Sequence, residues 1–195
     1  MLNKLLLITT LSVGAFAMHL GELNINERDL EIGAKFDLGQ FNDTIEPNTM
    51  FLGAKFLNAD QVNSDSNATI EPYSEVNFLI MNKIGDNGMK LGLGVKFNYT
   101  EDFSSLPLGI EFAYTIPAKE LIPMTLNGSV YYAPQSLSFS EGKDFLEYRV
   151  SYDVEIIKNA AVTIGFRKIN TTYKADKSSM INYNTSWFAG FKVSF

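Results

Sequence analysis

The chain has 195 residues, of which 46% are hydrophobic and only 19% are charged, and no segment shifts enough in composition to indicate a second domain. Its formal net charge of −6 and its lack of clustered Lys and Arg exclude nucleic acid as an expected partner. The absence of cysteine excludes disulfides, zinc–thiolate sites and a cysteine nucleophile, and no cofactor is expected.

The N-terminal residues have the pattern of a secretory signal peptide. Lys4 precedes an apolar stretch over 5–16, and residues 15–17 form an A-x-A cleavage pattern. The alternative, an uncleaved anchor helix, is disfavoured because the stretch is shorter than the roughly 20 apolar residues that cross a bilayer. We therefore predict a signal peptide over residues 1–17 and one mature domain over residues 18–195.

The mature chain alternates between apolar and polar residues with period two, which indicates β-strands. In Met89–Tyr99, for example, every second residue is apolar or aromatic, and the positions between them hold only Lys, Gly and Asn. Runs of about 10 residues suit a tilted membrane-spanning strand better than a globular sheet, whose strands average about 5 or 6 residues.

Ten strands are predicted in this way. Nine follow from the alternation, and the first is added because barrels of this kind normally have an even number of strands. Eight strands remain the alternative. The predicted strands are Met18–Ile25, Asp29–Leu38, Met50–Asn58, Tyr73–Met81, Met89–Tyr99, Leu106–Ile116, Met124–Ala133, Phe145–Ile156, Ala161–Ile169 and Ser186–Phe195.

The fold class that follows is an all-β, antiparallel, up-and-down transmembrane β-barrel. Only helices and closed barrels satisfy every backbone hydrogen bond in lipid, and no segment after residue 17 is apolar enough for a membrane-spanning helix. A soluble periplasmic barrel that holds an apolar ligand is the alternative. It fits less well, because its interior would have to accommodate a full row of large apolar side chains from every strand.

The connections between strands set the orientation, because periplasmic turns should be short and external loops long. Lys158–Asn159 and Gly85–Gly88 are predicted periplasmic turns, whose residues tolerate the positive φ that tight hairpins need. The other two periplasmic connections, Gly39–Thr49 and Pro117–Pro123, are longer than expected. The predicted external loops are Asn26–Arg28, Ala59–Pro72, Thr100–Ser105, Pro134–Asp144 and Asn170–Asn184.

The last predicted strand ends in phenylalanine, which is similar to the signal that the outer-membrane assembly machinery recognises. The residues of this assembly signal are Trp187, Phe191, Val193 and Phe195. The alternative is an ordinary amphipathic last strand of a periplasmic sandwich or lipocalin-like barrel. Aromatic residues also lie near predicted strand ends, where interfacial girdles form, at Tyr99, Tyr114, Tyr132 and Trp187.

The face opposite the apolar one carries equal numbers of positive and negative side chains. In a barrel of eight to ten strands the interior is narrow enough for side chains to fill, and close opposite charges should pair there. A mostly plugged lumen is therefore predicted, and a narrow, weakly selective channel lined by Glu111, Glu147, Arg149 and Arg167 is the alternative. The residues predicted to face the lumen are Lys35, Lys55, Glu75, Lys90, Lys96, Glu111, Glu147, Arg149, Asp153, Arg167 and Lys192, together with Glu31, Asp37 and Glu155.

Six glycines share this polar face. They either relieve strand curvature around long basic side chains or leave room for a narrow path, and the sequence does not decide between the two. These glycines are Gly33, Gly53, Gly92, Gly94, Gly109 and Gly165.

Little in the sequence indicates catalysis. The single histidine, His19, lies close to the predicted cleavage site, where a catalytic base would be poorly held, so we interpret it as part of a solvated terminus. No G-x-S-x-G elbow, P-loop or metal-spaced His cluster occurs. Two acidic pairs, Glu101 with Asp102 and Asp60 with Asp65, lack the glycine and distal glutamate of an EF-hand, which favours solvated loop charges over calcium sites. We predict that the chain is not an enzyme; a lipid-modifying enzyme that uses His19 is the alternative.

Two segments resemble the YfaZ family of outer-membrane proteins. The first is Tyr131-Tyr132-Ala133-Pro134-Gln135-Ser136-Leu137-Ser138-Phe139, which is followed by Tyr148, and the second is Gly165-Phe166-Arg167-Lys168-Ile169. The likeness extends to the Phe-terminated last strand and is weakest over the first third of the chain. The family looks like exported barrels without an established activity, so the resemblance implies location and fold and transfers no catalytic residue.

These observations together predict a small barrel in the outer membrane of a Gram-negative bacterium, with a structural or surface-interaction role. Its expected partners are outer-membrane lipid, lipopolysaccharide and the outer-membrane assembly machinery. The sequence leaves the oligomeric state open.

Overall fold

The structure is a computed structural model that describes residues 19–59, 72–116, 122–173 and 180–195. The predicted signal peptide over residues 1–17 lies outside the described residues. Outside them as well lie most of the predicted loop Ala59–Pro72, with Asp60 and Asp65, and most of the predicted turn Pro117–Pro123.

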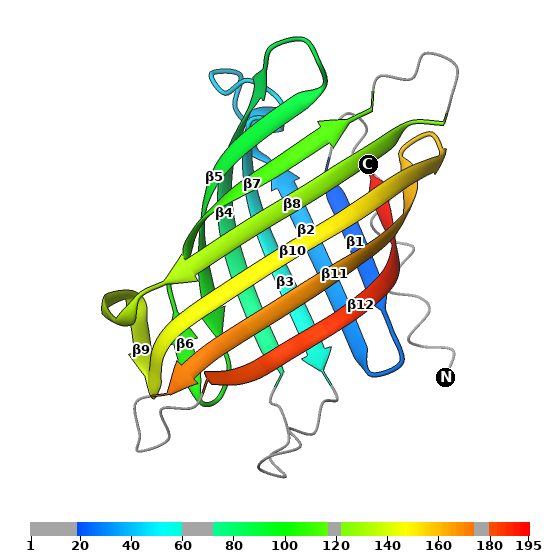
Figure 1. The fold of residues 1–195 in the computed structure, drawn as a ribbon. Helices are drawn as coiled ribbons and strands as arrows, with labels where there is room; N and C mark the ends of the chain where they lie inside the picture. Colours follow the sequence, from blue (N-terminus) through cyan, green and yellow to red (C-terminus); the bar gives the residue numbers. More distant parts are fainter. Residues whose placement is uncertain (1–18, 60–71, 117–121, 174–179) are drawn as a thin grey trace, which may run out of the picture.

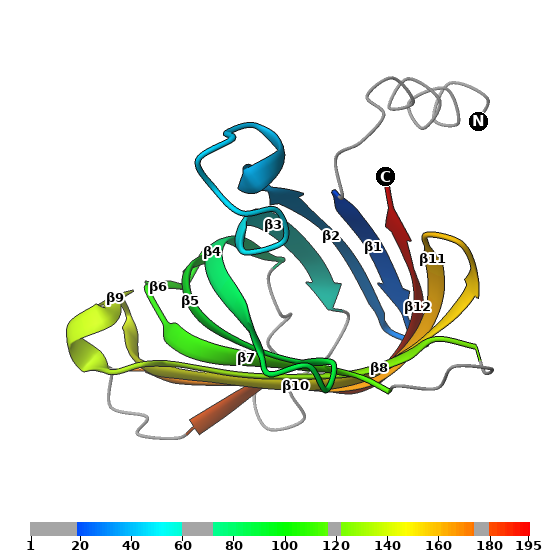
Figure 2. The ribbon, with the colours of Figure 1, turned by 90° about the horizontal axis from the view of Figure 1, so that it is seen from above.

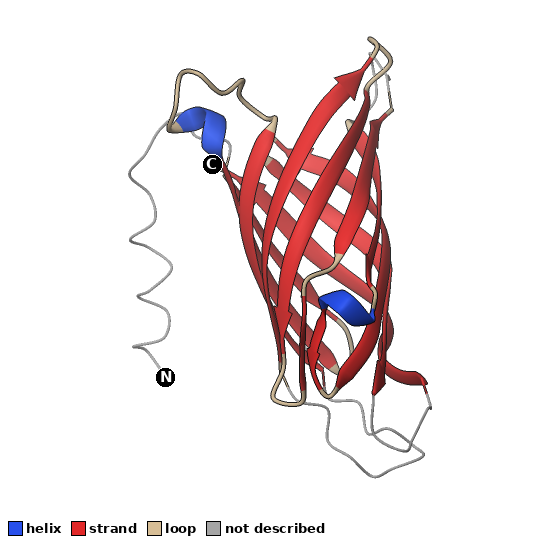
Figure 3. Ribbon diagram, turned by 90° about the vertical axis from the view of Figure 1, so that its left-hand side faces the viewer, coloured by secondary structure: helices blue, strands red, loops and turns tan. Residues whose placement is uncertain are grey.

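Ten long strands form the wall of the molecule (Figure 1). They are β1 (Leu20–Ile25), β2 (Asp29–Asp37), β3 (Met50–Ala59), β4 (Tyr73–Ile84), β5 (Met89–Tyr99), β7 (Leu108–Thr115), β8 (Met124–Ala133), β10 (Gly142–Ile157), β11 (Ala160–Tyr173) and β12 (Met180–Ser194). Two short strands, β6 (Phe103–Ser105) and β9 (Ser138–Ser140), pair with each other beside the wall. Two helical turns, η2 (Leu38–Gln40) and η3 (Gln135–Leu137), lie at opposite ends of it (Figure 3). Among the described residues, no helix has the length and apolarity needed to cross a membrane.

The ten long strands close into a barrel. Each one pairs antiparallel with the next along the chain, and β1 pairs with β12 from Leu20 opposite Ser194 to Ile25 opposite Ala189. Seen from above, the strands curve round so that β1 lies beside β12 (Figure 2). The structure therefore confirms the predicted antiparallel barrel with ten strands rather than eight.

Both termini of the described chain lie at one end of the barrel, here called the terminus end. The backbone N–H of His19 donates to the carbonyl of Phe195 at 2.7 Å, and the N–H of Phe195 donates back at 2.9 Å. Tight turns close β4–β5 and β10–β11 at the same end, with positive φ at Gly85, Gly88 and Asn159. The opposite end, here called the loop end, carries the connections that were predicted to be external.

Four strands, β4, β10, β11 and β12, extend at least three residues beyond their predicted ends, and the predicted loops Pro134–Asp144 and Asn170–Asn184 lose residues to them. β10 begins at Gly142, β11 continues to Tyr173 and β12 begins at Met180. The predicted loop Asn170–Asn184 is therefore wrong at 170–173 and 180–184, and its residues 174–179 lie outside the described residues. Its polar residues suggested a loop. Asn170 and Thr171 are instead buried residues of β11, with Thr171 on the inward face opposite Phe145.

The two faces of the wall differ in the way that the alternation predicted. Inward positions are buried and largely polar, whereas outward positions are exposed and apolar, as in β2, where Glu31 is buried and Ile32 is exposed. This arrangement is opposite to the one that a soluble barrel with an apolar interior would require. Exposed apolar side chains occur on every long strand and include Leu23, Ile32, Leu52, Val76, Leu93, Ile110, Val130, Val150, Ile164 and Phe191.

Candidate functional site in the barrel lumen

The charged residues predicted to face the lumen all occupy inward positions of their strands. Apart from Glu31, Asp37 and Glu155, eleven charged residues were predicted to face the lumen, and ten of them take part in ion pairs with partners on other strands. Lys90 is the exception: it has no ion-pair partner among the described residues. The paired residues are Lys35, Lys55, Glu75, Lys96, Glu111, Glu147, Arg149, Asp153, Arg167 and Lys192.

Arg167 lies at the centre of the first network. Its side chain is 1% exposed, and Nη1 donates to Glu31 at 2.5 Å while Nη2 donates to Asp29 at 3.2 Å. Nε donates to the side-chain oxygen of Asn184 at 2.9 Å. Since every guanidinium nitrogen has an acceptor, the buried positive charge is compensated.

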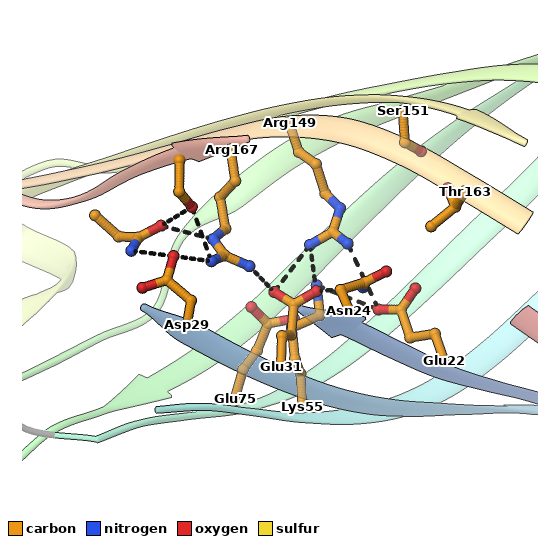
Figure 4. Close-up of polar contacts among 12 residues, drawn as sticks. Glu22, Asn24, Asp29, Glu31, Lys55, Glu75, Arg149, Ser151, Thr163 and Arg167 are labelled. Carbon is orange, nitrogen blue, oxygen red and sulfur yellow. Dashed lines mark hydrogen bonds and ion pairs between the residues drawn. The ribbon is translucent and has the colours of Figure 1, made fainter. Parts of the chain in front are cut away.

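Arg149 joins the same network from β10. Its Nη1 donates to both carboxylate oxygens of Glu31, at 2.7 and 2.9 Å. Figure 4 shows Arg149 and Arg167 reaching across the lumen toward Glu31. Because Glu31 belongs to β2 and the two arginines belong to β10 and β11, this network ties together strands that are far apart in the chain.

Lys96 forms the second network. Its ammonium lies 3.1 Å from the carboxylate of Glu75 and 2.9 Å from that of Glu147, and it sits 4.0 Å from the centre of the Tyr131 ring. The Tyr131 hydroxyl donates to Glu111 at 2.7 Å, and Glu111 also pairs with Lys35. The side chain of Tyr131 therefore contacts both the Lys96 ammonium and the Glu111 carboxylate, which belong to different ion pairs.

Asp153 forms a third network near the terminus end. Lys192 donates to both of its oxygens, at 2.7 and 2.9 Å, and Asn127 donates to one at 2.8 Å. Thr163 donates to the other oxygen.

Asp37, which was also predicted to face the lumen, has a different role. Its carboxylate accepts hydrogen bonds from the N–H groups of Gly39 and Asn48 and so caps the β2–β3 connection.

An apolar plug fills the lumen at the loop end. Phe145 stacks on Tyr73 with ring centres 6.4 Å apart, and Phe103 of the short strand β6 lies 6.1 Å from Phe145 and 6.2 Å from Tyr183. The wall at this level is lined by aliphatic side chains as well. The plug residues, all buried, are Leu57, Ala59, Tyr73, Phe103, Ala133, Phe145, Ile169 and Tyr183.

The plug was missed by the sequence reasoning, although a signal for it was present. Tyr73 shares its face with Glu75, Phe145 shares its face with Glu147, and Ile169 shares its face with Arg167. Each of these apolar residues therefore stands at the loop-side end of a polar row. Phe103 carried no such signal, because it belongs to a segment that was predicted to be an external loop.

The inward glycines make room for side chains rather than for a path through the barrel. A Cβ on Gly94 or Gly109 would lie within 2.4 Å of the Tyr131 side chain, and one on Gly165 would lie 2.4 Å from the Phe188 ring. A Cβ on Gly33 would lie 2.8 Å from the Glu22 carboxylate. The space beside these glycines is occupied by neighbouring side chains, which disfavours a narrow path, and the side chains are aromatic or acidic rather than the basic ones expected.

A cavity of about 260 Å³ remains among the networks, and Lys96, Glu111, Asp153 and Lys192 of the second and third networks line it. The charged residues Glu22, Lys55 and Arg149 line part of it, and the apolar residues Phe51 and Leu79 line another part. A second hollow of about 220 Å³ shares Leu20, Asp153 and Lys192 with it and is also lined by residues of the hairpin connections at the terminus end. The lumen is thus filled at the loop end and hollow at the terminus end.

His19 does not lie free in solvent, which corrects the solvated-terminus interpretation. Its ring stacks on Phe41 at 5.2 Å and meets the edges of Phe36 and Phe195 at 5.2 and 5.9 Å. Nδ1 is buried and has no hydrogen-bond partner among the described residues. The pairing of the first and last strands brings His19 to Phe195, which a sequence pattern alone could not indicate.

Three residues of the predicted assembly signal lie on the outer face of β12, and the fourth, Phe195, directly follows the strand. Trp187 is 69% exposed and packs against Phe166 on the neighbouring strand, with ring centres 5.4 Å apart. Phe191, Val193 and Phe195 follow it along the same face and are also exposed.

At the loop end, Glu101 and Asp102 are exposed. The described residues contain no group of acidic or histidine side chains arranged to hold a metal ion.

Comparison with known proteins identifies one family. No curated protein matches the chain, and no solved structure does. The family described as YfaZ precursor matches residues 79–195, which is more than half of the chain and includes the two segments on which the resemblance rests. The part of the chain before this region is the part where the likeness was weakest. The chain belongs to the YfaZ family.

Proposed function

We propose that the protein is an outer-membrane β-barrel with a structural or surface-interaction role. The observation that carries this proposal is the apolar outer surface, which continues around all ten long strands. Leu93 is 66% exposed and Trp187 is 69% exposed. A soluble monomer rarely exposes a continuous apolar surface of this extent, whereas lipid solvates it without cost. The family match and the closed barrel are consistent with this location.

The connections support an orientation with the terminus end in the periplasm. Short turns join β4 to β5 and β10 to β11 at that end, and the paired strands β6 and β9 lie in connections of the loop end. The β2–β3 connection over residues 38–49 departs from the rule, because it is long although it lies at the terminus end. In this orientation the loop end contacts lipopolysaccharide and outside partners, and the exposed face of β12 is available to the assembly machinery before the barrel closes. The role proposed here involves no enzymatic step.

Membrane fractionation combined with gel migration tests the location. The mature protein is expected in the outer-membrane fraction, and the unboiled protein is expected to migrate differently from the boiled one, because a closed barrel with a buried ionic interior resists detergent until it is heated. A soluble periplasmic protein whose migration does not depend on boiling would contradict the proposal.

A porin-like channel is the second candidate, and the lumen disfavours it. Two of the four residues predicted to line its path, Glu147 and Arg167, are fully buried in ion pairs, and the apolar plug lies beyond them toward the loop end. We expect no conductance steps above detergent background when the purified protein is added to planar bilayers. Reproducible steps that scale with protein concentration would favour the channel instead.

A further inference from the structure

The cavity at the terminus end contains charged groups whose binding capacity is unused. Glu22 Oε1 lies 3.8 Å from the ammonium of Lys55 and 4.0 Å from Nη2 of Arg149. Both distances exceed those of a direct hydrogen bond, so these groups attract one another without being satisfied. The ion pairs elsewhere in the lumen, such as those of Lys96 and Arg167, have separations of 2.5–3.2 Å.

Glu22 and Lys55 have no better partners in the described part of the chain, and Arg149 is satisfied by Glu31 through Nη1 only. Among the described residues, no side-chain hydrogen bond joins Glu22 or Lys55 to another residue, and Nη2 of Arg149 is buried without a hydrogen-bond partner. All three residues line the cavity, and their side chains are nearly buried. Figure 4 shows Glu22 and Arg149 facing each other across this gap. A buried charge without hydrogen bonds is costly, so a ligand or water that bridges these groups is stabilised.

The chemistry of the three groups is complementary to a zwitterion. A carboxylate is a suitable acceptor for Lys55 beside the buried guanidinium of Arg149, and an ammonium group is a suitable donor to Glu22. Another part of the cavity wall is apolar and consists of Phe51, Leu79, Met81 and Ala113. A ligand that carries both charges on one side and a hydrocarbon group on the other matches both parts of the wall.

We propose that this cavity binds a small zwitterion of the amino-acid class with an apolar side chain, which enters from the terminus end. The volume of about 260 Å³ lies just below the roughly 300–1,000 Å³ of sites for drug-sized ligands, which suits a molecule of this size. The apolar plug and the Arg167 network close the other direction. The site goes beyond the proposed structural role and does not depend on the membrane location.

Calorimetric titration of the folded, full mature chain in detergent micelles tests the ligand class. L-Leucine is expected to bind saturably. Two probes that lack one of its charged groups, 4-methylpentanoate and isopentylamine, are expected to bind at least about tenfold more weakly, because each leaves part of the charged group unsatisfied. No saturable heat with L-leucine, or equal binding of all three probes, would overturn the proposal and leave water as the occupant.

Variants locate the binding in the cavity. Glu22→Gln and Lys55→Met are each expected to weaken L-leucine binding by about tenfold or more, whereas Lys90→Met, which changes an inward lysine outside the cavity, leaves it unchanged. Ala113→Leu narrows the cavity without removing a charge and is also expected to abolish L-leucine binding. This variant keeps the test decisive if a charge variant does not fold. Unchanged binding in all of the cavity variants would contradict the site.

Discussion

Replacing Arg167 with methionine is expected to lower the free energy of unfolding of the barrel by about 3–5 kcal/mol, the range observed when one partner of a buried ion pair is removed. Arg167 is fully buried and holds Asp29 and Glu31 through direct hydrogen bonds. In the variant the negative charge of Asp29 loses its ion-pair partner, and Glu31 keeps only its ion pair with Arg149. Urea unfolding in detergent, followed by the gel shift between folded and unfolded forms, measures the loss.

Lys90→Met is the matched control for this experiment. It also removes a positive charge from an inward position, but Lys90 has no ion-pair partner among the described residues, so a change in stability within about 0.5 kcal/mol is expected. A second comparison uses Arg167→Met with Asp29→Asn, where removing both charges of this ion pair should recover part of the loss. If Arg167→Met and Lys90→Met unfold at the same urea concentration, the network does not stabilise the barrel.

Phe145→Ala is expected to destabilise the barrel by about 3–5 kcal/mol through the loss of the central ring of the apolar plug. Phe145 is fully buried and lies against both Tyr73 and Phe103, so its removal leaves a void that the rigid strands around it cannot close. The same unfolding measurement applies.

Phe97→Ala is the control on the outer face of the wall. Phe97 is 46% exposed, so its truncation removes contacts with detergent rather than with the lumen and is expected to cost clearly less than Phe145→Ala. Equal losses for the two variants would mean that the loop end of the lumen is not a packed core.

The alternation of residue types was enough to predict the barrel and its two faces. In a strand the side chains alternate strictly, so an apolar row such as Leu91, Leu93 and Phe97 shares one face wherever the strand lies. The ends of strands were harder to predict. Where both faces become polar, as at Asn170 and Thr171, the period disappears from the sequence although the strand continues.

The partners within the lumen could not be predicted from the sequence. Which side chains meet depends on the stagger of the strands and on barrel closure, both of which are long-range properties. The pairing of Glu31 with Arg167 joins residues 136 positions apart, and Glu22 was overlooked because the alternation of its short strand is weak. The sequence predicted that inward charges would pair, but it did not predict which residues form each ion pair.

The shortness of β1 has a consequence for the order of assembly. β1 pairs with β12 only between Leu20 and Ile25, whereas β11 and β12 pair along almost their whole length and are neighbours in the chain. Adjacent hairpins form early because little chain entropy is lost, and a contact between the two ends of the chain forms late. The β1–β12 seam is therefore the natural last step of folding, and its amide protons should be the first in the wall to exchange with solvent.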